Sequence, residues 1–311
     1  MHIKYHFLVI FMRLDAVEQV LLNLLLEDSS LGVGDLAQRL GKSRNYVARL
    51  VNGLFERGVL RGYTVVLNPL KILYDRSIFL FVKTNPHEVG IVRGLLGLPD
   101  IQVLDGISGE FSLLGLYRFR SPLEFGSFLS GLDRLMVVSR FKKYRLVEVL
   151  ATFKESGFVI PDSKTGYYTL SEFDWKLLGI LRQQVSHIPY SQTDVAKRLN
   201  VSQPVVSRSI SKLRSENVII GYTARIDFSA VDLEAKFYLE IRVDPRAYLS
   251  VAKKLCEFDE IWSLYRSGEE YGLMAVIRVK DIKHYNQLLL KIFEMEDIID
   301  TYSSVVFQEW M

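Results

Sequence analysis

Residues 34–64 read GDLAQRLGKSRNYVARLVNGLFERGVLRGYT, and residues 193–223 read TDVAKRLNVSQPVVSRSISKLRSENVIIGYT. The two stretches align without a gap at an offset of 159 residues. The same offset carries Asp15 onto Asp174, and Ser108-Gly109-Glu110 onto Ser267-Gly268-Glu269. Because chance matches would not keep one register from residue 15 to residue 110, we interpret the chain as two fused copies of one unit.

The first stretch predicts a short helix over residues 31–40, a tight turn at Gly41, and a longer helix over residues 44–57. Ser43 is a suitable N-cap, because its hydroxyl can accept hydrogen bonds from the first free amides of the longer helix. Gly58 is expected to end that helix, and residues 59–67 are expected to form a hairpin, the wing. The predicted buried stripe of the longer helix is Val47, Leu50, Val51 and Leu54.

The second stretch repeats this design. A helix opens at Ser191 or Gln192, and Ser202 is the expected cap of the next helix. Pro204 lies in the first turn of that helix, where its missing amide costs little. The predicted inward residues are Val206, Ile210 and Leu213. Short helix, turn, longer helix and strands indicate a winged helix-turn-helix, whose longer helix enters a DNA major groove.

The distribution of charge agrees with a local nucleic-acid surface. The whole chain has a formal net charge of only +3. Residues 34–62 hold six Lys or Arg against two Asp or Glu, whereas residues 255–311 hold five against eleven. The outward residues of the longer helices are therefore the predicted DNA contacts, with Arg, Asn and Gln suited to base edges. They are Ser43, Arg44, Asn45, Arg49, Asn52, Ser202, Gln203, Ser207, Arg208 and Lys212. The predicted phosphate contacts are Arg39, Lys42, Arg198 and Arg225.

After each head the pattern changes to βαββαβ, which is typical of a ferredoxin-like domain with two helices on one face of an antiparallel sheet. The fold class is therefore α+β, with two winged helix-turn-helix and two ferredoxin-like domains in tandem. In the first copy the elements are expected at residues 78–82, 89–96, 103–108, 113–119, 123–132 and 137–150. In the second they are expected at residues 237–243, 248–257, 261–267, 273–279, 282–293 and 299–307.

The expected divisions follow from these patterns. They are an N-terminal extension (1–12), a first head (13–70), a first sensor domain (71–153), a linker (154–170), a second head (171–230) and a second sensor domain (231–311). Because the regular pattern begins directly after Met12, we expect Met12 to be the native start. Cys256 is the single cysteine, which excludes an internal disulfide and a cysteine metal cluster. A cytoplasmic protein without a metal, a cofactor or a membrane contact is expected.

The combination resembles the Lrp/AsnC family of feast/famine regulators, over nearly the whole chain and twice. In the first copy the resemblance is carried by Leu14-Asp15, Ser43, Val47, Val51, Leu54, Gly58-Val59-Leu60, Gly62-Tyr63-Thr64 and Ser108-Gly109-Glu110. In the second it is carried by Asp174, Ser202, Val206, Ile210, Leu213, Val218-Ile219-Ile220, Gly221-Tyr222-Thr223 and Ser267-Gly268-Glu269. The sequence departs from the family where an Arg usually follows the capping Ser by seven residues, since Leu50 and Ser209 stand there.

The resemblance implies a DNA-binding regulator whose RAM-type sensor domains pair sheet to sheet and bind an amino-acid-like effector at their interfaces. Two fused copies could pair within one chain, and we expect such chains to form a dimer or a higher homo-oligomer because an open sheet face invites association. The expected effector-binding residues are Gly109, Glu110, Gly268 and Glu269, whose alternative role is a tight turn between two strands.

Two further functions remain open at this stage. Siroheme decarboxylases share the two-part architecture and act without a metal through His and Arg of the sensor domain, so His87 and His284 are the corresponding candidates. A ligand sensor that acts through protein contacts alone is the other alternative. Because the intact basic heads favour DNA binding, no catalytic residue is predicted. The two copies differ in their outward residues, Arg44-Asn45 against Gln203-Pro204, which predicts an asymmetric pair of DNA half-sites.

Overall fold

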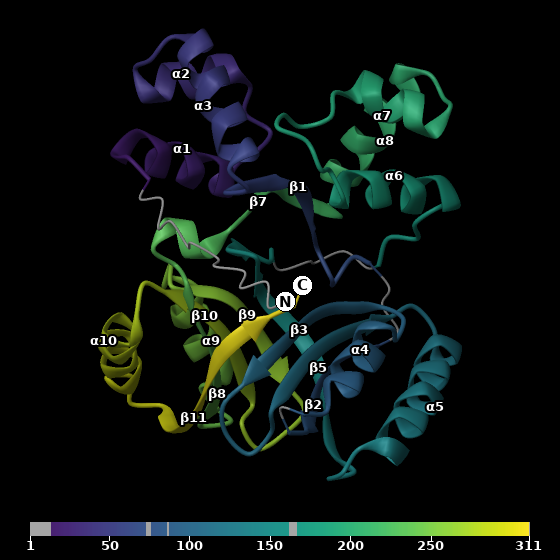
Figure 1. Ribbon diagram of the computed structural model, residues 1–311, viewed down its shortest axis with the longest axis vertical. Coiled ribbons are helices and arrows are strands. Elements are labelled where there is room, and N and C mark those ends of the chain that lie inside the picture. Colours follow the sequence, from purple (N-terminus) through teal and green to yellow (C-terminus); the bar gives the residue numbers. More distant parts are fainter. Residues whose placement is uncertain (1–13, 73–75, 86, 162–166, 311) are drawn as a thin grey trace, which may run out of the picture.

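The computed structural model describes residues 14–72, 76–85, 87–161 and 167–310 (Figure 1). The predicted N-terminal extension and the expected start at Met12 lie outside the described residues, as do residues 162–166 of the predicted linker. The first half of the chain contains α1 (Ala16–Glu27), α2 (Val33–Leu40), α3 (Arg44–Glu56), β1 (Leu60–Leu67), β2 (Arg76–Lys83), α4 (Val89–Leu96), β3 (Ile101–Ile107), β4 (Leu113–Phe119), α5 (Pro122–Val138) and β5 (Lys143–Glu155).

The second half follows the same order of elements, with β6 (Phe158–Val159) and the 3-10 helix η1 (Phe228–Val231) added. It contains α6 (Glu172–Arg182), α7 (Gln192–Leu199), α8 (Gln203–Ser215), β7 (Ile219–Ile226), β8 (Ala235–Val243), α9 (Tyr248–Cys256), β9 (Ile261–Ser267), β10 (Leu273–Val279), α10 (Ile282–Phe293) and β11 (Ile298–Glu309). Each half therefore comprises a three-helix head and a βαββαβ body.

The first head forms as its sequence indicates. Ser43 caps α3, because its Oγ accepts a hydrogen bond from the Tyr46 amide at 3.2 Å. Gly58 ends the helix at a positive φ of 73°, and the Val59 amide donates to the Leu54 carbonyl as in a Schellman motif. The predicted stripe faces inward: Val47, Val51 and Leu54 are buried and Leu50 is half-buried.

In the second head, the inward stripe Val206, Ile210 and Leu213 is confirmed. Ser202 occupies the N-cap position of α8, but its side chain makes no capping hydrogen bond, so that part of the prediction is wrong. Pro204 lacks an amide, and the next amide, that of Val205, donates to the Ser202 carbonyl at 3.0 Å instead of to its hydroxyl.

The predicted hairpin wing over residues 59–67 is wrong. The strand after α3 pairs with the other half of the chain, since β1 runs antiparallel to β7 with Thr64 opposite Thr223. The two strands form a ribbon that lies between the heads and the bodies (Figure 1). Ala224 of β7 packs in the core of the first head, while Val65 of β1 packs in the core of the second, so each head is completed by the other half.

The two bodies form one closed arrangement of strands. The first half contributes the order β3-β4-β2-β5 and the second contributes β11-β8-β10-β9, and the pairs β3–β11 and β5–β9 join them. Helices α4 and α5 cover the outside of one sheet, and α9 and α10 cover the other (Figure 1). Between the sheets lies an inner core with side chains from both halves, including Phe79, Tyr238 and Met274.

This arrangement bears on two expectations. The sensor bodies pair sheet to sheet inside one chain, as the sequence led us to expect. The open sheet face that was expected to drive association between chains is, however, buried within the chain. The predicted boundary between the second helix and the last strand of the first body also differs from the structure, because α5 continues to Val138 and β5 begins only at Lys143. Among the described residues, no helix combines the length and the apolar character that crossing a membrane requires.

Candidate nucleic-acid interface and effector site

Both heads lie at the same end of the molecule, beyond the β1–β7 ribbon and away from the sensor sheets (Figure 1). The residues of α3 predicted to read bases, Arg44, Asn45 and Arg49, are solvent-exposed, and Asn45 and Arg49 lie on the face opposite the buried Val47. Arg44 lies against α2, since a Cβ on Gly34 would stand 3.2 Å from its Nη2. Asn52 is half-buried, and its side-chain Nδ2 donates to Glu56 Oε1 at 2.8 Å.

On α8, Gln203, Arg208 and Lys212 are exposed and Ser207 is half-buried. Gln203 Nε2 donates to Gln192 Oε1 on α7 at 2.7 Å, so it links the two helices of the motif. Lys212 lies further along the helix, 5.3 Å from the ring centroid of Tyr168. A hydrogen bond to Tyr168 raises the pKa of Lys212 above its usual value.

Of the residues predicted to contact phosphates, three are exposed and one is half-buried. Arg39 and Arg198 are exposed in the last turns of α2 and α7, and the Arg198 guanidinium lies 4.2 Å above the Tyr190 ring. Lys42 is exposed in the turn before α3. Arg225 is separate from these, because it is half-buried on β7 and its Nη2 donates to the Gln184 carbonyl at 3.4 Å.

The departure from the family pattern now has a structural reason. Leu50 and Ser209 are half-buried, and Ser209 Oγ donates to Asp174 Oδ1 at 2.8 Å, which fixes α8 on α6. Arg49 and Arg208 lie one position earlier and are exposed. The shift by one residue therefore keeps an arginine on the outward face of each recognition helix.

The predicted effector residues gather at the end of the sheet pair that is remote from the heads. A cavity of about 150 Å³, here called the distal cavity, is lined by Glu110 together with Phe81, Ile107, Phe111, Arg145, Glu240, Tyr271, Tyr302 and Ser304. Glu269 does not line it but lies 3.4 Å from Arg145 Nη1. The Gly268 amide donates to the Glu148 carbonyl at 3.0 Å, and Gly109 turns at a φ of 115° beside Tyr302.

Among the described residues, Arg145 is the cation that lines the distal cavity. Its guanidinium lies 4.2 Å above the Phe81 ring, and its Nη2 donates to both oxygens of Glu240 at 3.1 Å. Its Nε is buried without an acceptor among the described residues. Burial raises the pKa of Glu240, and Arg145 partly offsets that rise. The cavity thus presents a spare cationic donor beside a carboxylate.

Sequence reasoning did not identify Arg145 or Glu240. In KFYLEIRV (236–243), Lys, Tyr, Glu and Arg alternate with apolar residues, a pattern typical of a strand with one solvent-exposed face, whereas Glu240 is buried. The two histidines considered for an enzyme function do not lie together in one site. His87 is exposed before α4, and His284 is exposed on α10, where its amide donates to Asp281 at 2.9 Å. Among the described residues, no cluster of three His, Cys, Asp or Glu side chains is arranged to hold a metal ion.

A comparison with known solved structures gives a similarity over almost the whole chain. It is to the crystal structure of the siroheme decarboxylase NirDL, with a TM-score of 0.64 and 16% identity over 94% of this chain and 91% of that chain. At that identity the likeness establishes the shared fold.

Sequence families and curated relatives point to the Lrp/AsnC group. The family described as "Lrp/AsnC ligand binding domain" matches residues 236–311, and "Winged helix-turn-helix DNA-binding" matches residues 170–220. The HTH-type transcriptional regulator LysM of Sulfurisphaera tokodaii is 27% identical over 45% of this chain and 97% of its own length. The regulator LrpA of Pyrococcus horikoshii is 30% identical over 36% of this chain and 77% of its own length. The chain therefore belongs to the Lrp/AsnC family.

Proposed function

We propose that this protein is a transcription regulator that binds sequence-specific sites on double-stranded DNA with α3 and α8. The observation that carries the proposal is the pair of recognition helices with exposed basic faces at one end of the molecule (Figure 1). The proposed base-edge contacts are Arg44, Asn45, Arg49, Gln203, Ser207 and Arg208. Arg39, Lys42, Arg198 and Lys212 are proposed to contact phosphates. Arg225 is proposed as a further phosphate contact, with less access to DNA than the others because it is half-buried on β7.

Fluorescence anisotropy with the DNA upstream of the protein's own gene tests this function. We expect the wild type to prefer that DNA to random sequence and to lose affinity steeply with salt. The double variant Arg49→Ala/Arg208→Ala should lose the preference, since one base-reading Arg contributes about 1–3 kcal/mol.

A matched control removes two exposed arginines from the sensor helices, Arg93 on α4 and Arg134 on α5. Arg93→Ala/Arg134→Ala changes the net charge equally and should keep the preference. Equal, weak binding of all sequences by the wild type would contradict the proposal.

We further propose that the chain is a tandem duplication that acts as a built-in pseudo-dimer, with the division into heads, bodies and linker set out above. Its support is the repeated order of elements, the offset of 159 residues, and the length of LysM, of which 97% aligns with 45% of this chain. In this view the β1–β7 ribbon and the paired sheets take the place of contacts between two separate chains.

For the distal cavity we propose an amino-acid-like effector. Arg145 offers a donor for a carboxylate, and Glu110 and Glu240 offer acceptors for an ammonium group. Calorimetric titration with L-amino acids tests this, with Arg145→Gln expected to weaken binding and Arg93→Ala expected to leave it unchanged. If none of the amino acids gave binding heat, the effector proposal would fail while the DNA proposal stood.

The enzyme alternative rests on the fold shared with NirDL. Against it stands the placement of His87 and His284, which are exposed on different halves and line neither the distal cavity nor the larger cavity beside the ribbon. Incubation with siroheme separates the two functions. A regulator leaves the mass of the siroheme unchanged. Loss of carboxyl groups from the siroheme would favour the enzyme function and overturn the DNA-binding proposal.

A further inference from the structure

A second cavity lies where the heads join the sensor pair. This junction cavity has a volume of about 270 Å³ and is lined by Thr64–Leu67 of β1, by Arg182 at the end of α6, and by strands of both bodies. Tyr238 on β8 lines it, whereas Glu240, two residues along the same strand, lines the distal cavity. The two cavities therefore occupy opposite ends of the space between the sheets. None of the DNA-binding, phosphate-binding or effector-binding residues predicted from the sequence lines the junction cavity.

The lining of the junction cavity is basic. Its cations are Arg118, Arg182, Lys236 and Arg278, and its carboxylates are Glu155 and Glu309. Asp105 contacts Lys236 from outside the lining, so among the described residues the cations outnumber the carboxylates by four to three. Lys236 and Arg278 each have only 6% of the side chain exposed. A buried charge of this kind is costly unless it is fully paired and hydrogen-bonded.

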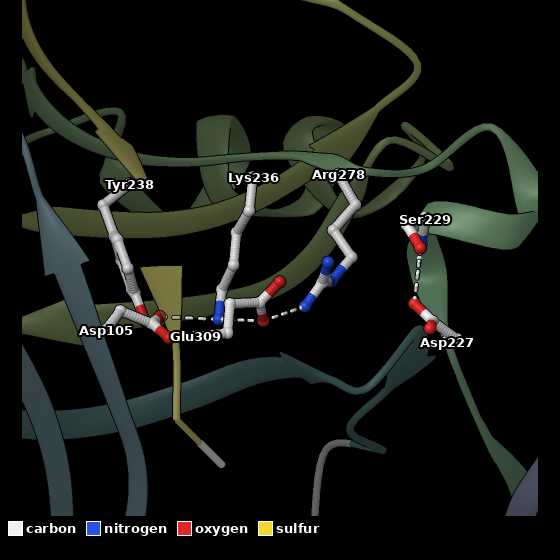
Figure 2. A network of polar contacts seen from close by, with 7 residues as sticks. All are labelled: Asp105, Asp227, Ser229, Lys236, Tyr238, Arg278 and Glu309. Carbon is white, nitrogen blue, oxygen red and sulfur yellow. Dashed lines mark hydrogen bonds and ion pairs between the residues drawn. The ribbon is translucent and has the colours of Figure 1, made fainter. Parts of the chain in front are cut away.

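Lys236 is paired with two carboxylates, whereas the pairing of Arg278 is incomplete. Figure 2 shows Lys236 between Asp105 and Glu309, with Nζ–O distances of 2.6 and 3.0 Å, and Glu309 shared with Arg278. Arg278 uses only Nη2 for this contact, and its Nε and Nη1 are buried without an acceptor among the described residues. Buried donors without a partner are rare and commonly mark an unseen ligand or water.

The lining of the junction cavity also includes aromatic and apolar side chains. Phe79, Trp262 and Tyr265 line it together with Val103 and Val276. A guanidinium with spare donors beside aromatic walls is suited to a ligand that has an anionic group and an apolar body. We propose that the junction cavity binds a small organic anion whose carboxylate or phosphate oxygens accept hydrogen bonds from Arg278.

The position of the site gives the ligand access to both parts of the molecule. Arg182 ends α6 of the second head, and its Nη2 donates to Gln102 Oε1 on β3 of the first body at 2.8 Å. An anion seated here contacts the ribbon, a head helix and both sheets at once. The site is independent of the DNA-binding proposal, because its test measures ligand binding by the full chain without DNA.

Isothermal titration of the full chain with succinate, inorganic phosphate and uncharged succinamide, at constant ionic strength, tests the site. We expect succinate or phosphate to bind with a dissociation constant of about 1 mM or below, and succinamide to give no heat. Binding of succinate would indicate that the ligand carries a carboxylate, and binding of phosphate would indicate that it carries a phosphate group.

Variants locate the binding. Arg278→Gln should weaken it at least about tenfold, because a charged hydrogen bond to the ligand is lost. Arg182→Gln should weaken it too, because a cation of the lining is removed. Arg182 takes no part in the buried ion pairs around Glu309, so its variant tests the site even if Arg278→Gln fails to fold. Arg93→Gln, on α4 and outside the lining of both cavities, should bind the anion as the wild type does. Binding of neither anion, equal binding of succinamide, or unchanged affinity in Arg182→Gln would overturn the inference.

Discussion

At the scale of single residues, the ribbon depends on one glycine. Gly62 has a φ of 133°, and a Cβ there would stand 2.0 Å from the Gln184 carbonyl oxygen, to which the Tyr63 amide donates. Gly58 also has a positive φ, 73°, but a Cβ there would meet nothing within 4 Å. The two glycines share a backbone constraint and differ in the space around them.

Gly62→Ala should therefore destabilise the protein more than Gly58→Ala. We expect Gly58→Ala to cost about 1 kcal/mol from its left-handed backbone alone, and Gly62→Ala to exceed this because the contact with Gln184 must break. Urea unfolding of the two variants gives the comparison. Equal losses would mean that the ribbon tolerates separation from Gln184.

The buried network predicts a dependence of stability on pH. Burial alone would raise the pKa of Glu309, but Lys236 and Arg278 outweigh it and hold the pKa below its usual value of 4.5. A carboxyl with a depressed pKa in the folded state stabilises the protein above its unfolded pKa, and this contribution is lost as the pH falls through the folded value. The difference in unfolding free energy between wild type and Glu309→Gln should thus shrink on acidification from pH 7 to below pH 4.5. A constant difference would contradict this linkage.

At the scale of elements, the two recognition helices begin differently although both follow a serine. Ser43→Ala should lower the free energy of unfolding by about 1 kcal/mol, since it removes a capping hydrogen bond. Ser202→Ala is the matched control with an expected loss of less than half of that, because its hydroxyl makes no capping bond. Equal losses in chemical denaturation would show that the caps are equivalent in solution.

Elements whose pattern is local could be predicted from the sequence. The bounds predicted for residues 113–119, 261–267 and 273–279 match β4, β9 and β10, because mostly apolar segments are flanked there by turn residues or polar residues. The partner of β1 could not be predicted, since a strand pattern does not reveal which distant strand it pairs with. The junction cavity was missed for a similar reason: Lys236, Arg278 and Glu309 come from three separate strands and meet only in the folded chain.

At the scale of the whole molecule, the closed pair of sheets leaves the outer helices for any contact between chains. Apolar side chains are exposed on α5 and α10: Leu123, Val137, Val138, Ile282, Leu290 and Phe293. We expect light scattering to give the mass of two or more chains of 35.8 kDa each. The double variant Val138→Glu/Phe293→Glu should shift the mass toward that of a single chain. A single-chain mass for the wild type would show that the internal pseudo-dimer is sufficient.

The central claim is that one chain presents two different recognition helices to one DNA site. Selection of binding sites from random DNA tests it most directly. The wild type should enrich two unlike half-sites, separated by about one helical turn or a multiple of it, and Arg208→Ala should relax only one of them. Enrichment of perfect palindromes, or relaxation of both half-sites by this single substitution, would contradict the account.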